Sequence, residues 1–148
     1  MVEIRPITDE DQALVQSFLT ACLPESNRAF EPDGRHCKLK DIQRYFKQFW
    51  CLSIDGCLAG TVGISELSKT ACELKTLFVL KQYHGNGYGE QLARHAIAFA
   101  QSAGYTDIYL DTMSESKAVI FLYKKLGFTK TERYNDNPVA DVFMKRRL

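Results

Sequence analysis

The feature that most constrains this chain is a junction at residues 85–89, where every second residue is glycine. An apolar run at 74–80 precedes it and is typical of a strand, and residues 90–103 follow with apolar side chains at helical spacing. The first N–H groups of a helix have no partner within the helix, and the positive end of the helix dipole lies beside them. A strand, a glycine turn and a helix together therefore predict an anion site, such as a site for phosphate or pyrophosphate.

The spacing of the glycines excludes two common phosphate-binding motifs. A dinucleotide-binding turn follows the pattern G-x-G-x-x-G, but its third glycine would fall on Glu90. A P-loop needs Lys and Ser or Thr after its last glycine, and here Glu90 and Gln91 stand there. A glycine-rich turn that binds nothing remains the alternative interpretation of the motif taken alone.

Length and charge narrow the class of protein. The 148 residues are expected to form one domain, 1–148, which is large enough for a hydrophobic core. Nineteen basic and eighteen acidic residues leave a net charge of +1, so no basic surface for nucleic acid is expected. No apolar run approaches the roughly 20 residues that cross a bilayer, and the N-terminus lacks a signal-peptide pattern, so neither a membrane nor export is expected.

The cysteines indicate a reducing compartment. There are five of them and no C-x-x-C pair, which argues against both a disulfide framework and a zinc site. We therefore expect a cytoplasmic protein without a bound metal, in which Cys51, Cys57 and Cys72 are small core residues.

Hydrophobic periodicity predicts a mixed α/β sheet with helices on both faces, in the order β-α-α-β-β-β-α-β-α-β-β. An Asp-Gly pair at 55–56 indicates a tight hairpin. The crossover helix before residues 106–111 predicts that this strand runs parallel to 71–80. The predicted strands are 2–7, 50–54, 57–65, 71–80, 106–111, 128–134 and 141–145. One predicted helix begins directly after a capping motif at 8–11, and three others span about 39–48, 87–103 and 117–126.

Two motifs in this order carry a resemblance to a known family. The first is His84-Gly85-Asn86-Gly87-Tyr88-Gly89, and the second, about 35 residues later, is Leu122-Tyr123-Lys124-Lys125-Leu126-Gly127-Phe128. The chain resembles small, single-domain, bacterial-type members of the GNAT family, the Gcn5-related N-acetyltransferases. Their turn reads Q/R-x-x-G-x-G/A and their later helix ends in L-Y-x-K-L-G-F. His84 replaces the usual Gln or Arg, which removes a cationic side chain but leaves the backbone donors.

The resemblance implies that acetyl-CoA is the cosubstrate and assigns residues to it. The pyrophosphate would be held by the backbone N–H groups of the turn, namely His84, Gly85, Asn86, Gly87, Tyr88 and Gly89. The pantetheine arm would lie as an added strand along Leu77, Phe78 and Val79, which requires the two neighbouring strands to diverge there. Ser116 stands where the family often has Asn, and its hydroxyl is expected either to meet the pantetheine amide or to cap the following helix.

The resemblance also implies two catalytic residues. Tyr123 matches the proton donor to the departing thiolate, since a phenol with a pKa of about 10 can hydrogen-bond to a thiolate of pKa about 8.5 or protonate it; the alternative is a core tyrosine. Glu73 matches the position of a glutamate base, and strand alternation would place it on the same face as Val79. The alternative for Glu73 is a solvated edge residue or a partner of Lys75. Tyr134 and Asp111 are weaker candidates for the base.

The predicted reaction is direct acetyl transfer to a primary amine of a small molecule or peptide. The resemblance assigns acceptor choice to residues 19–46 and the late hairpin, but the mixed charges there do not identify the amine. Two alternatives stay open: a GNAT-fold sensor that binds acyl-CoA without turnover, and a phosphate-binding domain unrelated to acyl transfer. A homodimer is also left open.

Overall fold

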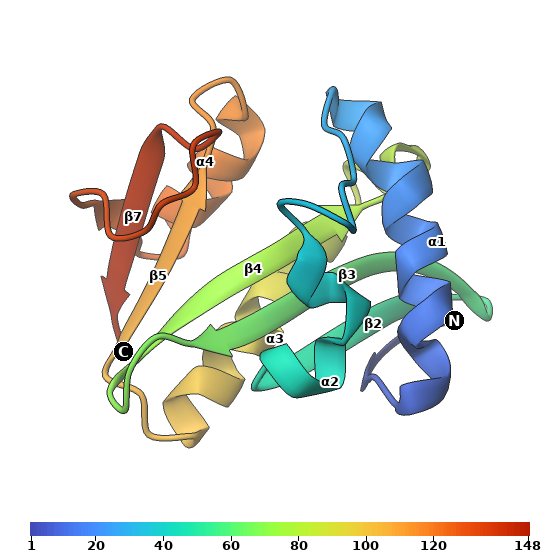
Figure 1. Cartoon of the computed structure of the whole chain (residues 1–148), viewed down its shortest axis with the longest axis horizontal. Helices are drawn as coiled ribbons and strands as arrows, with labels where there is room; N and C mark the ends of the chain where they lie inside the picture. The colour runs from blue at the N-terminus through green and yellow to red at the C-terminus, as the bar shows by residue number, and fades with distance from the viewer.

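A computed structural model describes all residues 1–148 and shows one seven-stranded mixed sheet with helices on both faces (Figure 1). The strands lie in the order β1-β2-β3-β4-β5-β7-β6. Their bounds are β1 Val2–Pro6, β2 Gln48–Ile54, β3 Cys57–Glu66, β4 Ala71–Val79, β5 Asp107–Thr112, β6 Thr129–Lys130 and β7 Val142–Arg147. The helices are α1 Gln12–Cys22, α2 Ile42–Tyr45, α3 Tyr88–Ser102 and α4 Lys117–Lys125. No helix is both long and apolar enough to span a bilayer.

Strands β1 to β4 lie side by side and antiparallel, and the Asp-Gly pair makes the tight turn between β2 and β3. Asp55 and Gly56 have φ values of 50° and 83°, the left-handed conformations that a two-residue hairpin with right-handed strand twist requires. This confirms the predicted hairpin.

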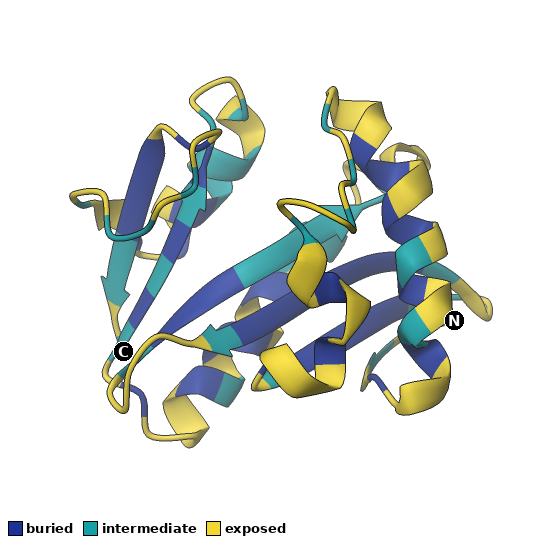
Figure 2. Cartoon of the chain, in the orientation of Figure 1, coloured by how far each residue is buried: buried dark blue, intermediate teal, exposed yellow.

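Strands β4 and β5 pair over only one end of their length. They are parallel, as predicted, and their register joins Ala71–Glu73 to Asp107–Tyr109 and then stops. Beyond Glu73 the two strands diverge into a V, which Figure 1 shows clearly. The predicted divergence is therefore confirmed. Residues of β4 also change from buried to half-buried at Lys75, where the V opens (Figure 2).

A β-bulge in β4 changes which side chains share a face of the sheet. The register against β3 shifts between Thr61 and Gly63, and the opposing Thr76 has a φ of 57°. Its carbonyl accepts a 2.8 Å hydrogen bond from the Thr61 hydroxyl. The extra residue inverts the alternation of side chains beyond it.

The expected facing of Glu73 was therefore wrong. Leu74, before the bulge, and Val79, after it, both pack in the core beneath α3. Phe78 packs on the opposite face, which is also the face of Glu73. Glu73 thus shares a face with Phe78 and not with Val79.

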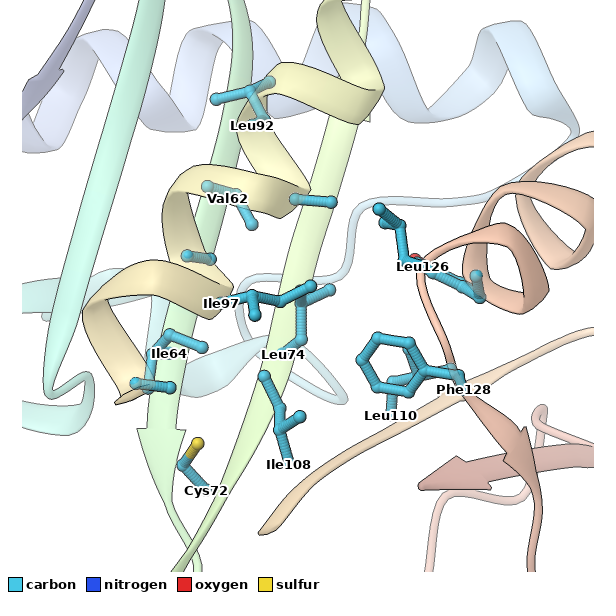
Figure 3. Close-up of a cluster of buried hydrophobic side chains, with 14 of the residues drawn as sticks. Val62, Ile64, Cys72, Leu74, Leu92, Ile97, Ile108, Leu110, Leu126 and Phe128 are labelled. Carbon is cyan, nitrogen blue, oxygen red and sulfur yellow. The ribbon is translucent and has the colours of Figure 1, made fainter. Parts of the chain in front are cut away.

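Two apolar clusters hold the sheet between its helices. One lies beneath α3 and α4 and includes Leu74, Leu92 and Phe128 (Figure 3). The other lies beneath α1 and α2 and includes Leu19 and Phe49.

The cysteines were only partly assigned correctly. Cys51 and Cys72 are core residues as expected, and Cys22 is buried as well. Cys57 is exposed, because it begins β3 directly after the hairpin turn.

Two predicted elements are shorter than expected. The helix at 39–48 is a 3₁₀ turn, Cys37–Lys40, followed by the single turn of α2. The side chain of Gln12 separates them, since it donates to the Leu39 carbonyl (2.7 Å) and accepts from Ile42 N–H (3.0 Å).

The strand predicted at 128–134 ends at Lys130. Arg133 instead holds a loop, because its guanidinium donates to the carbonyls of Asn137 (2.9 Å) and Ala140 (3.1 Å).

Candidate active site

A cleft of about 1180 Å³ opens where β4 and β5 diverge. Its walls come from the outer half of β4, the glycine turn, the start of α4, and the loops at 25–28, 35–39 and 135–138. Every predicted site residue lines this cleft except Asn86 and the weaker base candidate Tyr134. The side chain of Asn86 turns back instead and donates to the carbonyls of Tyr83 (3.0 Å) and His84 (3.3 Å).

The glycine turn presents a row of free backbone donors to the cleft, which we call the amide cradle and define as the N–H groups of residues 85–90. None of these six consecutive groups donates a hydrogen bond within the protein. Gly85 and Gly87 have φ values of 83° and 82°, and a side chain at either would enter open space. The 15-residue helix α3 begins in the cradle, so its dipole adds to the attraction for an anion.

The cradle is displaced by one residue from the expected position. The N–H of His84 is not free, because it donates to the carbonyl of Lys81 at 3.0 Å. The side chain of His84 has a different function: its Nε2 donates to the Val79 carbonyl at 2.7 Å. His84 thereby ties the start of the cradle to the end of β4.

The free edge of β4 offers main-chain groups to the cleft at alternate residues. Leu80 N–H donates to Ala59 O of β3 at 2.9 Å, and Phe78 is paired with Thr61 of the same strand. Alternation then directs the N–H and C=O groups of Leu77 and Val79 toward the gap, where the Val79 carbonyl already accepts from His84. The expectation for Phe78 was wrong, since its backbone faces β3 and only its side chain reaches the cleft.

Tyr123 lies at the inner wall of the cleft on α4. Its residue surface is only 5% exposed, and its ring packs against Phe128 with 5.7 Å between centroids. Its hydroxyl makes no hydrogen bond within the protein, although the residue lines the cleft. Burial raises the pKa of Tyr123 above its usual value, despite the opposing influence of Arg28. The phenol is therefore held in its protonated, donating form.

Ser116 does not cap α4 through its side chain, which was one of its two expected functions. Its hydroxyl instead accepts a 2.8 Å hydrogen bond from Nη2 of Arg28, which lies 88 positions earlier in the chain. The Arg28 guanidinium also lies 5.8 Å from the centroid of the Phe78 ring. Arg28 thus crosses the cleft between its two walls.

Glu73 lies within a hydrogen-bonded acidic cluster, which we define as Glu73, Asp111, Tyr134, Asn135 and Asn137. Glu73 Oε2 accepts from the Tyr134 hydroxyl (2.6 Å) and from Asn135 Nδ2 (3.2 Å). The same amide donates to Asp111 Oδ2 at 2.6 Å, and Asn137 Nδ2 lies 3.3 Å from Asp111 Oδ1. One side-chain amide therefore bridges two carboxylates.

The second oxygen of Glu73 is less engaged. Glu73 Oε1 lies 3.7 Å from Lys75 Nζ and accepts no other contact. The Glu73 side chain is 7% exposed, so it is not the solvated edge residue of the alternative interpretation, although its pairing with Lys75 holds. Burial, and then the charge of Glu73, raise the pKa of Tyr134, which keeps that phenol as the hydrogen-bond donor.

Sequence reasoning missed three residues of the site and gave a fourth a different function. Arg28 lies in the segment 19–46, whose mixed charges identified no ligand, and Asn135 and Asn137 lie in the late hairpin. Tyr134 was considered only as a base. The one signal for them was the Asn-Asp-Asn-Pro sequence at 135–138, because amides that flank a turn can hold neighbouring carboxylates through hydrogen bonds.

Comparison with known proteins agrees with this fold and cleft. The family model for the acetyltransferase (GNAT) family matches residues 13–128, so the chain belongs to that family. The chain is 33% identical over 98 residues to the N-alpha-acetyltransferase RimI of Mycobacterium tuberculosis, a match that covers 62% of this chain and 60% of that protein.

Solved structures show the same fold. A GNAT-family acetyltransferase from Staphylococcus aureus Mu50 superposes with a TM-score of 0.89 at 22% identity, over 99% of both chains. A GNAT-family acetyltransferase from Elizabethkingia anophelis, solved with acetyl-CoA bound, superposes with a TM-score of 0.74 at 18% identity, over 99% and 98% of the two chains. The chain spans about half the length of the curated relatives it matches, for example 41% and 46% of two of them.

Proposed function

We propose that this protein transfers an acetyl group from acetyl-CoA to a primary amine by direct attack. The observation that carries the proposal is the amide cradle of residues 85–90, which shares one cleft with the free edge of β4 and with Tyr123. An anion site, a strand edge and a buried acid in one cleft match the three parts of an acyl carrier: its diphosphate, its amide-containing arm and its thioester.

The chain's own groups suit each part of the donor. Six N–H groups and the α3 dipole would hold the diphosphate, and the backbone of Leu77 and Val79 would bond to the pantetheine arm as to an added strand. The relative from Elizabethkingia anophelis was solved with acetyl-CoA, which supports this choice of donor.

In the proposed step the amine nitrogen forms a bond to the thioester carbonyl carbon while the C–S bond breaks. Main-chain N–H groups near Leu77 stabilise the charge that develops on the carbonyl oxygen. Tyr123 gives its proton to the departing thiolate and recovers one from solvent. The products are the acetamide and free CoA thiol.

Glu73 is the proposed acceptor of the proton that the amine must lose. Its Oε2 is held by Tyr134 and Asn135, which leaves Oε1 to take the proton directly or through a water molecule. The burial of the carboxylate in the cleft and its fixed orientation support this assignment over the weaker candidate Asp111, both of whose oxygens accept amide donors.

The test is release of free thiol from acetyl-CoA in the presence of a panel of amines, with binding of acetyl-CoA measured separately by calorimetry. Acetyl-CoA binding with thiol release for at least one amine supports the proposal. Binding without release for any amine would favour an acyl-CoA sensor, and no binding by folded protein would favour a domain unrelated to acyl transfer.

A further inference from the structure

Arg28 is the one half-buried cation in the cleft that has no carboxylate within ion-pair distance. Lys75 is paired with Glu73, and Arg35 is paired with Glu31 at 3.0 Å. Arg28 has a single hydrogen bond, from Nη2 to the neutral hydroxyl of Ser116. Its Nε and Nη1 groups donate no hydrogen bond to a carboxylate, so most of the N–H donors of the guanidinium are available to a ligand.

The position of Arg28 makes an anion favourable there. Burial lowers the pKa of Arg28 from its usual value, because the charged form has lost part of its hydration. A partly desolvated guanidinium with one neutral partner gains more from a carboxylate than an exposed one does, and its fork matches the two oxygens of that group.

Further positive charge surrounds the same part of the cleft. Burial and the charge of Arg35 lower the pKa of His36, Glu31 opposes them, and Lys75 and Arg28 lower it further. His36 and the three cations line the cleft. A ligand with two or more positive charges would meet repulsion along this wall.

The cleft also holds negative charge, next to Lys75. Glu73 and Asp111 are held together by the amide of Asn135, with Glu73 Oε1 left for a ligand. Asp111 influences the pKa of Arg28, yet the two are not within ion-pair distance. A small molecule that carries both charges can lie between them.

We propose that the acceptor is an amine that also carries a carboxylate, as a free amino acid does, with its carboxylate on Arg28 and its ammonium beside Glu73 and Asp111. This inference rests on the proposed acetyl transfer. It disfavours polyamines and lysine side chains of basic peptides as acceptors, because those would place additional positive charge against Arg28, which no carboxylate of the protein pairs with.

The test compares each common amino acid with its carboxamide, alongside spermidine and a lysine-containing peptide, by thiol release with acetyl-CoA. Loss of the carboxylate lowers the pKa of the neighbouring amine, so the carboxamide has more of the neutral nucleophile and would react faster if nothing recognised the acid. We expect the best amino acid to exceed its carboxamide by about 10- to 100-fold in kcat/KM, the range of a hydrogen-bonded charge pair.

Three variants test whether Arg28 causes the preference for the amino acid over its carboxamide. Arg28→Gln should reduce kcat/KM for the amino acid to within about 3-fold of its carboxamide, while Arg28→Lys should retain part of the preference. Both should bind acetyl-CoA as the wild type does. Arg44→Gln is the matched control, because Arg44 also stacks on an aromatic ring, that of Tyr45, but lies outside the cleft; its preference should be unchanged.

Equal reaction of amino acids and carboxamides, or a preference for spermidine or the peptide, would overturn this inference and leave the proposed function intact. An Arg28→Gln variant that loses acetyl-CoA affinity, with its acceptor preference unchanged, would assign Arg28 to the donor and also overturn it. Thiol release with none of the amines would remove both proposals.

Discussion

The hydroxyl of Tyr134 donates a 2.6 Å hydrogen bond to Oε2 of Glu73, although the two residues are 61 positions apart in the sequence. This contact fixes which oxygen of the carboxylate faces the cleft. Glu73 comes from β4 and Tyr134 from the loop before β7, so the two separated sides of the V cooperate in orienting one carboxylate.

Tyr134→Phe tests the orientation of Glu73. The variant removes a hydrogen bond to a charged group, and we expect kcat/KM for the amine to fall by about 10-fold or more while the Kd for acetyl-CoA is unchanged. Steady-state kinetics and calorimetry measure the two quantities. Tyr109→Phe is the control, because the Tyr109 ring packs with 5.0 Å between its centroid and that of Tyr134 but its hydroxyl makes no hydrogen bond to Glu73. Equal losses in both variants would indicate a packing effect.

Tyr123→Phe tests the assigned proton donor. We expect kcat to fall by about 10²- to 10⁴-fold, the usual contribution of general acid catalysis, with the Kd for acetyl-CoA nearly unchanged. Tyr105→Phe is the matched control: Tyr105 is also a buried tyrosine, and its hydroxyl donates to Glu66 away from the cleft. An unchanged kcat in Tyr123→Phe would remove its catalytic assignment.

The pH dependence gives an independent test of Tyr123. Burial raises its pKa above the usual value near 10, so the donating form persists throughout neutral and moderately alkaline pH. Deprotonation of Tyr123 therefore contributes no loss of kcat below about pH 10. Measurement of kcat from pH 7 to 10 checks this, with Tyr123→Phe as the reference. A decline between pH 8 and 9 that is present in the wild type and absent from the variant would contradict it.

Gly87→Ala tests the amide cradle. Gly87 has a φ of 82°, so alanine there is strained by about 1 to 2 kcal/mol, and its methyl group enters the space beside the free N–H groups. We expect the Kd for acetyl-CoA to rise by at least about 10-fold. Gly104→Ala is the matched control: Gly104 lies at the far end of α3, has a φ of 92°, and has open space where the methyl group would be, so alanine there carries the same strain. Thermal unfolding should show similar losses for both variants, and equal acetyl-CoA affinity in the two would contradict the assignment.

Asp11→Asn tests an ion pair that holds β1 to the start of α1. Arg5 donates to both Asp11 oxygens at 2.8 Å, and this contact is the main reason that the pKa of Asp11 is lowered. Since Arg5 is partly exposed, we expect the variant to lose about 1 to 2 kcal/mol in the free energy of unfolding at neutral pH. Denaturant unfolding measures it.

The sign of the pH effect follows from the lowered pKa of Asp11. Its stabilisation is fully present above the unfolded-state pKa of about 3.9, declines as the pH falls below that value, and is lost only as the pH falls through the lowered folded-state pKa. The difference between wild type and Asp11→Asn should therefore shrink below pH 4. Asp33→Asn is the control, because its pairing with Lys40 is fully exposed and should have no measurable effect. A difference that does not shrink between pH 5 and pH 2 would contradict the ion-pair explanation.

The sequence alone determined the features of this protein that depend on neighbouring residues. The Asp-Gly hairpin, the crossover helix and the alternating glycines each act through local backbone conformation, so the order of the elements, the parallel pairing of β4 with β5, the family and the position of the amide cradle to within one residue could all be predicted. Pairing of two motifs about 35 residues apart then indicated the site of Tyr123.

Only the tertiary structure decided which side chains meet in the cleft. The bulge at Thr76 reversed which face of the sheet the later side chains of β4 occupy, because one unpaired residue shifts the two-residue alternation. No local sequence pattern predicted this bulge. Arg28 reaches Ser116 across 88 positions, and Asn135 joins Glu73 to Asp111 across 62 and 24. Such contacts depend on how the helices and loops pack over both sides of the opened sheet, which is a property of the folded chain and not of any segment within it.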